Sequence, residues 1–346
     1  MSQPQSPVFV PPEWNRHRAI WLAWPWNEDE WGEPLAGAQR CVAAFAVATA
    51  AAGEAVEFLM PPGDDLPLAA LIDAGAKLTS EVPASGQIRT HALPYGDIWL
   101  RDTGPFFGVG REGTAEALLC AWNGWGGKYL MDGDAEIGKR IATIAGVPYS
   151  SNAWIMEGGS LDFDGAGRVL TTRECVLNPN RNPGWTEKVA EKALAEMFGV
   201  EQVVWLDKGL HHDHTDGHVD NIARFIAPGV AVAMRPSGAD DPHTDRLLAI
   251  RADLEASLGR ENVRVIPSPG LVTHPIDGSV LPASYMNFLI ANEAVLVPVY
   301  GTPYDDAACR ALGELFPGRR ITPIRANYLL TGGGSLHCCS KEEALQ

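Results

Sequence analysis

The stretch TGGGSLHCCS at residues 331–340 places two adjacent cysteines, Cys338 and Cys339, after three glycines. Such thiols can be small core residues, half of a disulfide, metal ligands or a nucleophile. A disulfide between neighbouring cysteines needs a strained ring, which disfavours that interpretation. We expect the pair to lie on a short strand, where adjacent side chains face opposite ways and only one can face a given pocket. This alternation does not choose between the two sulfurs.

Carboxylates form the second group of residues that could carry chemistry. Asp102 lies in RDTGP, Glu157 in MEGGS and Asp216 in HTDGHVDN, each beside a glycine or another small residue. Asp before Gly commonly stabilises a turn, which accounts for Asp216. Turn formation explains Asp102 less well and Glu157 least, because Glu is a poor turn former. We therefore treat Asp102 and Glu157 as candidate site residues.

His218 and Asp220 are two residues apart. On a strand their side chains would project from the same face. A histidine beside a carboxylate can act as a general acid or base, because the carboxylate tunes its charge. The alternative is a surface pair or a hydrogen-bonded histidine of the core.

A thiol, a histidine and several acids in one pocket would be an unusual combination. Nearby carboxylates raise the pKa of a thiol and suppress the thiolate, which suits a protease poorly. The combination becomes useful when the substrate is a cation. At about 4 Å and an effective dielectric near 20, a unit charge contributes roughly 4 kcal/mol, enough to generate a thiolate only when substrate is bound. A guanidinium fits best, since it is planar, permanently charged and pairs with carboxylates bidentately.

The segment HHDHTDGHVD at 211–220 suggests a metal site as an alternative, with His211, His212, His214 and His218 as ligands. It lacks the HExxH spacing, and the sequence has no CxxC or second compact ligand group. A zinc-dependent hydrolase that uses these histidines therefore remains a rival function. Our main expectation includes no metal and no organic cofactor.

Charge and composition narrow the class of partner. The formal net charge is −16 and the sequence pI is about 4.9. This acidic balance disfavours nucleic acid and anionic membranes, and it favours the approach of a small cation. The sequence shows no signal peptide, and the apolar segment 43–59 is too short to span a bilayer and is expected to be a buried helix. Six scattered cysteines without a signal peptide indicate reduced thiols in the cytoplasm.

The pattern of elements is that of strands followed by amphipathic helices in an α/β fold. We expect a helix leading into a turn at 70–82, helices at 187–200 ending near Gly199 and at 307–318, and a strand at 203–206. No linker divides the chain, so residues 1–346 are expected to form a single domain.

A looser regularity concerns segments with a polar entry, an apolar strand and a glycine turn. The polar entries fall near residues 102, 157, 218, 285 and 338, at spacings of 55, 61, 67 and 53. This spacing suggests one structural unit of 50–70 residues, used several times, as in propeller-like folds. A ring of such units would direct every polar entry toward one central site.

Taken together, the motifs identify a family. The chain resembles the agmatine deiminases of the guanidine-modifying (pentein) superfamily, to which peptidyl-arginine deiminases also belong. The likeness is carried by eight ordered segments, at 11–25, 97–107, 122–129, 156–167, 171–183, 213–225, 284–292 and 332–338. The resemblance implies a five-bladed α/β propeller of ββαβ units around a central active site.

The resemblance also implies roles for individual residues. The family nucleophile is the cysteine directly after a histidine in the glycine-rich motif, which is Cys338 here. The His-x-Asp pair falls on His218 and Asp220, and Trp99 matches a tryptophan that lines the site. The acids of the two remaining motifs are Asp102 and Glu157. Cys339 would be a structural neighbour, and CCS at 338–340 departs from the family pattern after the nucleophile.

The activity implied is hydrolysis of agmatine to N-carbamoylputrescine and ammonia through a covalent cysteine thiouronium, within putrescine and polyamine metabolism. Cys338, His218, Glu157, Asp220 and Asp102 would be catalytic. Asp102, Asp220 and Trp99 would also bind the substrate. A homo-oligomer is compatible with the sequence.

Two further alternatives remain open. A deiminase of free or peptidyl arginine is the nearest, because four arginines in or near the motifs could bind an α-carboxylate: Arg101, Arg173, Arg181 and Arg224. The other is a non-catalytic ligand-binding protein that uses its 11 tryptophans as stacking surfaces.

Overall fold

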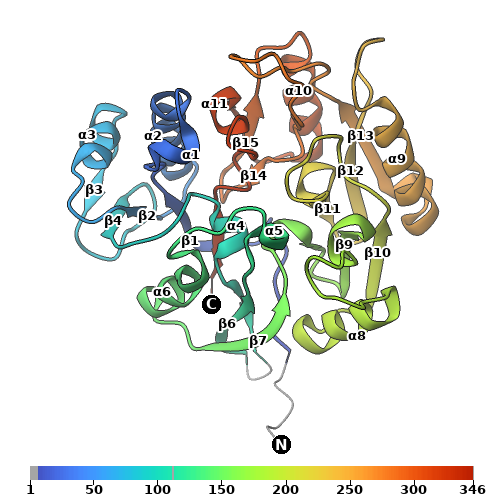
Figure 1. The fold of residues 1–346 in the computed structure, drawn as a ribbon, viewed down its shortest axis with the longest axis horizontal. Coiled ribbons are helices and arrows are strands. Elements are labelled where there is room, and N and C mark those ends of the chain that lie inside the picture. Colours follow the sequence, from blue (N-terminus) through green and yellow to red (C-terminus); the bar gives the residue numbers. More distant parts are fainter. Residues whose placement is uncertain (1–6, 111–112, 346) are drawn as a thin grey trace, which may run out of the picture.

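The computed structural model describes residues 7–110 and 113–345, which form a mixed α/β fold. Within these ranges the strands make five separate sheets. Figure 1 shows the sheets around the middle of the molecule, with α6 (Asp134–Ala145), α8 (Glu187–Phe198) and α9 (Thr244–Leu258) toward its edge. The α/β class predicted from the sequence is confirmed.

Four of the sheets share one plan. A short edge strand runs antiparallel to a central strand, and a helix then leads to a third strand parallel to the central one. The crossover helices are α6, α8, α9 and α10 (Asp305–Leu315). The strands of the four sheets, in chain order, are β5 (Phe106–Val109), β6 (Ala115–Ala121) and β7 (Tyr149–Ile155); β8 (Asp162–Phe163), β9 (Arg168–Thr172) and β10 (Gln202–Leu206); β11 (Ala223–Ala227), β12 (Val230–Arg235) and β13 (Val263–Pro267); and β14 (Leu289–Ile290), β15 (Ala294–Val299) and β16 (Arg320–Arg325).

The fifth sheet repeats this plan with strands from both ends of the chain. β17 (Lys341–Ala344) is antiparallel to β1 (His17–Ala23), which is parallel to β2 (Val56–Met60) after the crossover helix α2 (Leu35–Ala51). The sheet is extended by two more strands and carries one further helix: β4 (Ile88–Ala92), β3 (Leu78–Thr79) and α3 (Leu66–Asp73).

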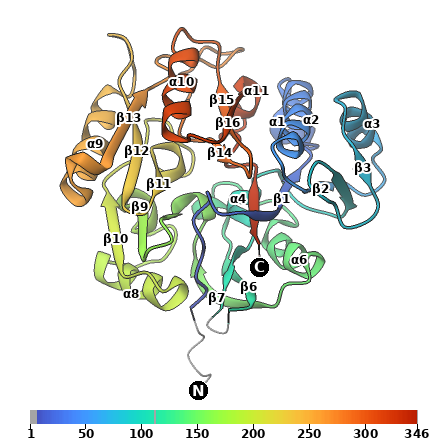
Figure 2. The same ribbon diagram turned by 180° about the vertical axis from the view of Figure 1, so that it is seen from behind.

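Side chains reinforce the pairing of β17 with β1, which Figure 2 shows from behind. Glu343 is almost fully buried and accepts hydrogen bonds from the guanidinium of Arg18. The same carboxylate accepts a bond from Trp21 Nε1 at 3.0 Å. These contacts join segments more than 300 residues apart in the sequence, so the fifth sheet depends on both ends of the chain.

Each edge strand is preceded by a short turn of helix or a tight turn. These are α4 (Leu100–Thr103) before β5, η1 (Gly158–Ser160) before β8, η2 (Val219–Asn221) before β11, and turns at 285–286 and 336–339 before β14 and β17. The five polar entries noticed in the sequence lie at or beside these turns. The predicted recurrent unit is therefore confirmed at the level of its strands and their entries.

The individual elements agree with most of the predictions. The helix predicted at 187–200 is α8, which ends where Gly199 adopts the left-handed conformation at φ 68°. The strand predicted at 203–206 is β10 and the helix at 307–318 is α10. The helix leading into a turn predicted within 70–82 is the end of α3, which stops at Asp73; a turn at 74–75 and then β3 follow. The remaining short elements are α1 (Glu28–Trp31), α5 (Gly124–Gly127), α7 (Arg173–Val176), α11 (Asn327–Leu330) and η3 (Arg260–Asn262).

The single buried helix predicted over 43–59 is wrong in its second half. Helix α2 ends at Ala51, and Gly53 turns the chain with φ 84°. Residues 56–60 then form β2 between β1 and β4, buried at every position. Burial on both faces removes the alternation that normally marks a strand, so this apolar run could not be distinguished from helix. No helix in the described part of the chain has the length and apolar character needed to cross a membrane.

The contacts of Glu343 lead to a stability prediction. Glu343→Ala should lower the free energy of unfolding by about 2–4 kcal/mol, because it leaves the Trp21 N–H buried without an acceptor and Arg18 without its carboxylate. Urea denaturation followed by circular dichroism measures this change. The matched control is Glu196→Ala, in an exposed pair with Lys192, which should change stability by about 0.5 kcal/mol or less. Equal effects of the two substitutions would contradict the role given to this carboxylate.

Candidate functional site

A cavity of about 220 Å³ lies where the polar entries near residues 102 and 338 meet. Asp102 lines it from α4, Trp99 from the residue before α4, and Cys338 from the turn before β17. Its remaining lining residues come from α1, α5 and the segments before α4, after α5, before η2 and after α11: Glu30, Trp31, Asp97, Trp125, Tyr129, Met131, His214, Thr215, Thr331, Gly332, Gly333 and Gly334. Three of the six predicted site residues thus line the cavity directly.

Cys338 lies in a turn and not on the predicted strand. The backbone N–H groups of residues 337 and 338 donate to Oδ1 of Asn287, at 2.9 and 3.2 Å, and so do not pair with a neighbouring strand. The sulfur of Cys338 is 3.1 Å from Asn287 Nδ2 and 3.7 Å from Asp220 Oδ2. Cys339 is buried and is not among the residues that line the cavity.

Asp102 is held by two donors on the cavity floor. Its Oδ1 accepts the backbone N–H of Gly159 at 2.8 Å, and its Oδ2 accepts Trp125 Nε1 at 2.9 Å. The same Oδ2 lies 3.7 Å from His218 Nδ1. The carboxylate is therefore fixed in orientation while it remains part of the cavity lining.

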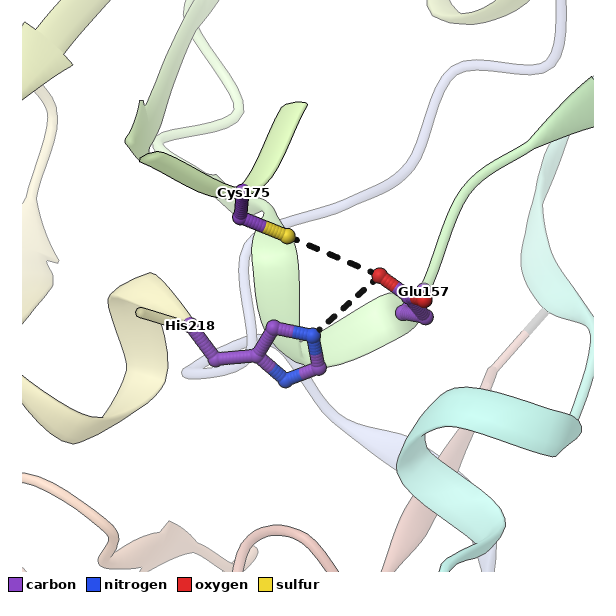
Figure 3. A group of neighbouring side chains, drawn as sticks. All are labelled: Glu157, Cys175 and His218. Atoms are coloured by element: carbon purple, nitrogen blue, oxygen red, sulfur yellow. Dashed lines mark hydrogen bonds and ion pairs between the residues drawn. The ribbon is translucent and has the colours of Figure 1, made fainter. Parts of the chain in front are cut away.

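His218 lies beneath the cavity and is fully buried. It caps the start of η2, so the segment is a turn of 3₁₀ helix and not a strand. Figure 3 shows its ring beside Glu157 and Cys175, with Nε2 3.3 Å from Glu157 Oε2. The Cys175 thiol lies 3.6 Å from the same oxygen, and Arg181 Nε donates to the other Glu157 oxygen at 2.8 Å.

Asp220 is fully buried on the other side of Cys338. Its Oδ2 bonds to Nδ1 of His337 at 2.7 Å, and Nε2 of that ring bonds to Glu13 Oε2 at 2.7 Å. Glu13 also lies 2.9 Å from the guanidinium of Arg224. A chain of alternating charges thus runs from the thiol side of the site toward the centre of the molecule.

Gly159 shows how closely these groups converge. A Cβ atom built on Gly159 would lie 2.6 Å from His218 Nδ1, 3.0 Å from Asp102 Oδ1 and 3.1 Å from Asp220 Oδ2. Three side chains from two separate segments therefore meet at one residue without a side chain. A turn of 3₁₀ helix brings His218 and Asp220 to one location.

Two polar atoms in this region remain without a hydrogen-bond partner among the described residues. They are His218 Nδ1 and Asp220 Oδ1, both buried. Buried polar atoms are nearly always paired in native proteins, so unpaired ones at a cavity indicate the place of a ligand. A donor-rich ligand would satisfy the Asp220 oxygen.

The buried charges shift the pKa values of these groups in different directions. Burial alone would lower the pKa of His218, but Asp102 and the hydrogen bonds with Cys175 and Glu157 outweigh it and raise the pKa well above 6.5. Burial would raise the pKa of Glu157, yet His218 and Arg181 lower it overall. The resulting pair is an imidazolium beside a carboxylate.

The two acids nearest the thiol differ from each other. Burial would raise the pKa of Asp220, but the hydrogen bond and charge of His337 lower it. For Asp102, burial and the charges of Asp220 and Glu157 outweigh His218, and the pKa rises. Burial, followed by Asp220 and Asp102, raises the pKa of the Cys338 thiol well above 9.0. The thiol is accordingly protonated until something compensates these charges.

Aromatic rings form the walls above this floor. Trp99 stacks on Trp31 with ring centroids 5.8 Å apart, and Trp31 Nε1 donates to Asp97 Oδ1 at 3.0 Å. Trp125, a further lining residue, packs edge-on against Tyr129 at 6.0 Å. Flat apolar walls with an anionic floor suit a planar cation.

Several residues of the site were not identified from the sequence. Asn287, His337, Trp125, Cys175 and Glu13 all contact the predicted site residues or continue their hydrogen-bond chain. Each lies within one of the eight segments that carry the family resemblance, so segment membership was the available signal, but residue type alone gave none of them a role. The same holds for the buried pairing of Arg181 with Glu157.

The metal site suggested by the segment 211–220 does not assemble. His211 pairs with Asp245 at the surface, His214 is at the cavity wall, and His218 is buried below it. Among the described residues, the group with the donors and closeness of a metal site is Glu157, Cys175 and His218, whose ligand atoms lie within 4.8 Å of one another. Glu157 is also paired with Arg181 there, at 2.8 Å.

The four candidate arginines are also engaged elsewhere. Arg101 pairs with Glu342, Arg181 with Glu157 and Asp216, Arg224 with Asp162 and Glu13, and Arg173 with Glu187. No arginine or lysine of the described chain lines the cavity, whereas three acids do: Glu30, Asp97 and Asp102.

Comparison with known proteins agrees with this geometry. The model of the Porphyromonas-type peptidyl-arginine deiminase family matches residues 9–343. The agmatine deiminase of Stutzerimonas stutzeri is 33% identical over 368 residues, which cover 98% of this chain and 96% of that protein. The chain belongs to the agmatine deiminase family.

Solved structures of the agmatine deiminase family have the same fold. The agmatine deiminase of Enterococcus faecalis superposes with a TM-score of 0.88 at 26% identity, covering 99% of this chain and 98% of that one. A C. jejuni agmatine deiminase with substrate bound gives 0.87 at 25% identity, covering 98% and 96%. The likeness therefore extends over nearly the whole length of the chain.

The buried pair of His218 and Glu157 allows a titration to be predicted. His218 should remain protonated at pH 7.5, and Glu157→Gln should lower its pKa because a negative charge next to the ring is removed. Nitrogen-15 NMR of labelled histidine measures both states. The chain has nine histidines, so the others, such as surface His211, serve as internal controls for folding. A neutral His218 at that pH, or an unchanged pKa in the variant, would contradict the charge assignment.

Proposed function

We propose that this chain hydrolyses agmatine to N-carbamoylputrescine and ammonia. The observation that carries the proposal is that Cys338 and Asp102 line one aromatic-walled cavity, while buried Asp220 contacts Cys338 and buried His218 contacts Asp102. Relatives across the full length of the chain bear the name agmatine deiminase. The reaction needs a nucleophile, a proton donor and water, so it calls for neither a metal nor an organic cofactor.

Binding of the guanidinium is assigned to Asp102 and Asp220. Asp220 Oδ1 has no other partner among the described residues, and Asp102 faces the cavity with further lone pairs. Planar N–H pairs of the substrate match these carboxylates, and Trp99 provides a flat wall for a cation–π contact. The bound cation favours the thiolate of Cys338 by roughly 4 kcal/mol at about 4 Å, which offsets the effect of the neighbouring acids, and the thiol proton passes to solvent.

The first chemical step is attack of the Cys338 thiolate on the guanidinium carbon. A carbon–sulfur bond forms, and the former C=N electron pair moves onto nitrogen. His218, kept protonated beside Glu157, donates a proton to one amino group, which leaves as ammonia. A cationic thiouronium remains covalently attached to Cys338.

Hydrolysis of this intermediate completes the reaction. His218 is now neutral and accepts a proton from a water molecule as the water attacks the thiouronium carbon. Collapse of the adduct breaks the carbon–sulfur bond, passes the hydroxyl proton to solvent, releases N-carbamoylputrescine and regenerates the Cys338 thiolate. Glu157, itself held by Arg181, stabilises the imidazolium at both stages.

The charges around the cavity favour agmatine over arginine. An arginine substrate needs a cation for its α-carboxylate, and the arginines considered for this role are paired with carboxylates away from the cavity lining. Agmatine carries an ammonium at that end, which suits the acids Glu30 and Asp97 of the lining. The acidic lining therefore supports agmatine over arginine as the substrate.

The proposal extends to the molecule as a whole. The five sheets of common plan, with their entries near one cavity, support a five-bladed α/β propeller formed by residues 1–346 as one domain. Six free cysteines support a reducing, cytoplasmic location. A homo-oligomer stays a prediction.

A substrate panel tests the proposed function. With agmatine, free arginine and a peptidyl arginine at equal concentration, ammonia should be released from agmatine at least about 100-fold faster in kcat/KM, since a misplaced carboxylate among acids costs several kcal/mol. Activity should survive exhaustive chelation, which separates this mechanism from that of a zinc hydrolase. Preference for an arginine substrate, or no turnover of any of the three, would refute the proposal.

The two adjacent cysteines provide a sharper test of mechanism. Cys338→Ala should abolish turnover, and agmatine should leave a mass adduct on the peptide that carries Cys338 in the unmodified enzyme during turnover. Cys339→Ala is the matched control and should retain most activity, because its thiol does not line the cavity. Similar losses in both variants would remove Cys338 from the role of nucleophile.

A further inference from the structure

Asn287 has an unusual position beside the Cys338 sulfur. It is fully buried between β14 and the turn at 336–339, and its side chain uses both of its polar atoms on residue 338. Oδ1 accepts the Cys338 backbone N–H at 3.2 Å, and Nδ2 lies 3.1 Å from the sulfur. One amide therefore holds both the backbone and the thiol of the same residue.

The orientation of this amide is determined by its surroundings. Oδ1 also accepts the backbone N–H of His337 at 2.9 Å, so this end of the side chain must be the oxygen. At the other end Nδ2 donates to Asn221 Oδ1 at 2.9 Å. Asn221 in turn donates to Asp213 Oδ2 at 3.2 Å. With the oxygen committed to two N–H groups, an N–H of Asn287 must point at the sulfur.

An N–H donor at this place matters because the thiol has otherwise unfavourable neighbours. Asp220 and Asp102 oppose the thiolate, and so does burial. A hydrogen bond from a neutral amide favours the anionic sulfur and carries no charge that would repel a cationic substrate. A lysine or arginine could stabilise the thiolate as well, but it would oppose the guanidinium.

We propose that Asn287 is a positioning residue that donates a hydrogen bond to the Cys338 thiolate and so sets its reactivity. This inference rests on the proposed function in one respect, which is that the function requires Cys338 to react as a thiolate. The hydrogen bond itself can be tested without agmatine. The acceptor half of the amide holds the turn at 336–339, while the donor half acts on the sulfur.

Two substitutions separate these halves. Asn287→Asp keeps an oxygen for the two backbone N–H groups but replaces the donor with an anion. Asn287→Ala removes both functions. The readout is the rate of alkylation of Cys338 by iodoacetamide between about pH 7 and pH 10, the range over which thiols ionise, followed by mass spectrometry of its peptide in the absence of substrate.

At pH 8 we expect alkylation of Cys338 to slow about tenfold or more in both variants, because the N–H that favours the anionic sulfur is lost in each. Asn287→Asp should be the slower of the two, since it adds a third anion. The matched control is Asn292→Ala. Asn292 lies further along the chain in an amide network with His17 and Glu54 and has no hydrogen bond to Cys338. Its alkylation rate should equal that of the unmodified protein.

The outcomes distinguish a donor from a scaffold. If Asn287→Asp alkylates as fast as the unmodified protein and only Asn287→Ala is slower, the residue only holds the turn and the proposal is overturned. The same conclusion follows if Asn292→Ala slows alkylation equally, because the effect is then general loosening. Alkylation that follows the prediction in a protein that does not turn over agmatine would leave the hydrogen bond standing and refute the proposed function alone.

Discussion

The structure depends on compensating a cluster of ionisable groups that is almost completely removed from water. Asp220 and Asp102 act on the Cys338 thiol, Glu157 lies beside His218 and the Cys175 thiol, and all three acids are buried. Such burial is costly unless every charge has a partner. His218 and Arg181 compensate Glu157, while His337 compensates Asp220. Asp102, which has neutral donors and a raised pKa, is the least compensated acid. The proposed substrate binds beside Asp102, where the negative charge is least compensated.

This requirement explains the architecture better than any single element does. The partners of the cluster come from segments as far apart as Glu13 and His337, and most stand at the entry to a sheet or beside one. Side chains on one helix or strand could not enclose a small cation from all sides. Turns of 3₁₀ helix before edge strands can, because they direct backbone N–H groups and side chains toward one location. Gly159 permits the final approach, since any side chain there would collide with His218.

Much of this could be predicted from the sequence, and the failures have physical causes. Residue types led to His218 and both site aspartates, because acids gathered around a thiol become useful when the substrate is a cation. The choice of Cys338 over Cys339 came only from the family resemblance. Periodicity led to α8 and α10, whose faces are unequally buried. It failed for β2, where both faces are buried, and for the turns at 218 and 338, which follow from contacts remote in sequence. Asn287 could not be assigned a role, because an amide shows its function only through its partners.

The pairing of β17 with β1 has a consequence for how the molecule is made. During synthesis on the ribosome, residues 17–23 emerge long before residues 341–344, so the first sheet must wait for nearly the whole chain before it gains its last strand. The turn that carries the reactive sulfur lies directly before that strand. The turn that holds the thiol and the pairing of β17 with β1 therefore form together and late. Contacts of such long range make folding slow. The acids of the site are thus synthesised before the cysteine, and the reactive site is complete only when the whole fold has formed.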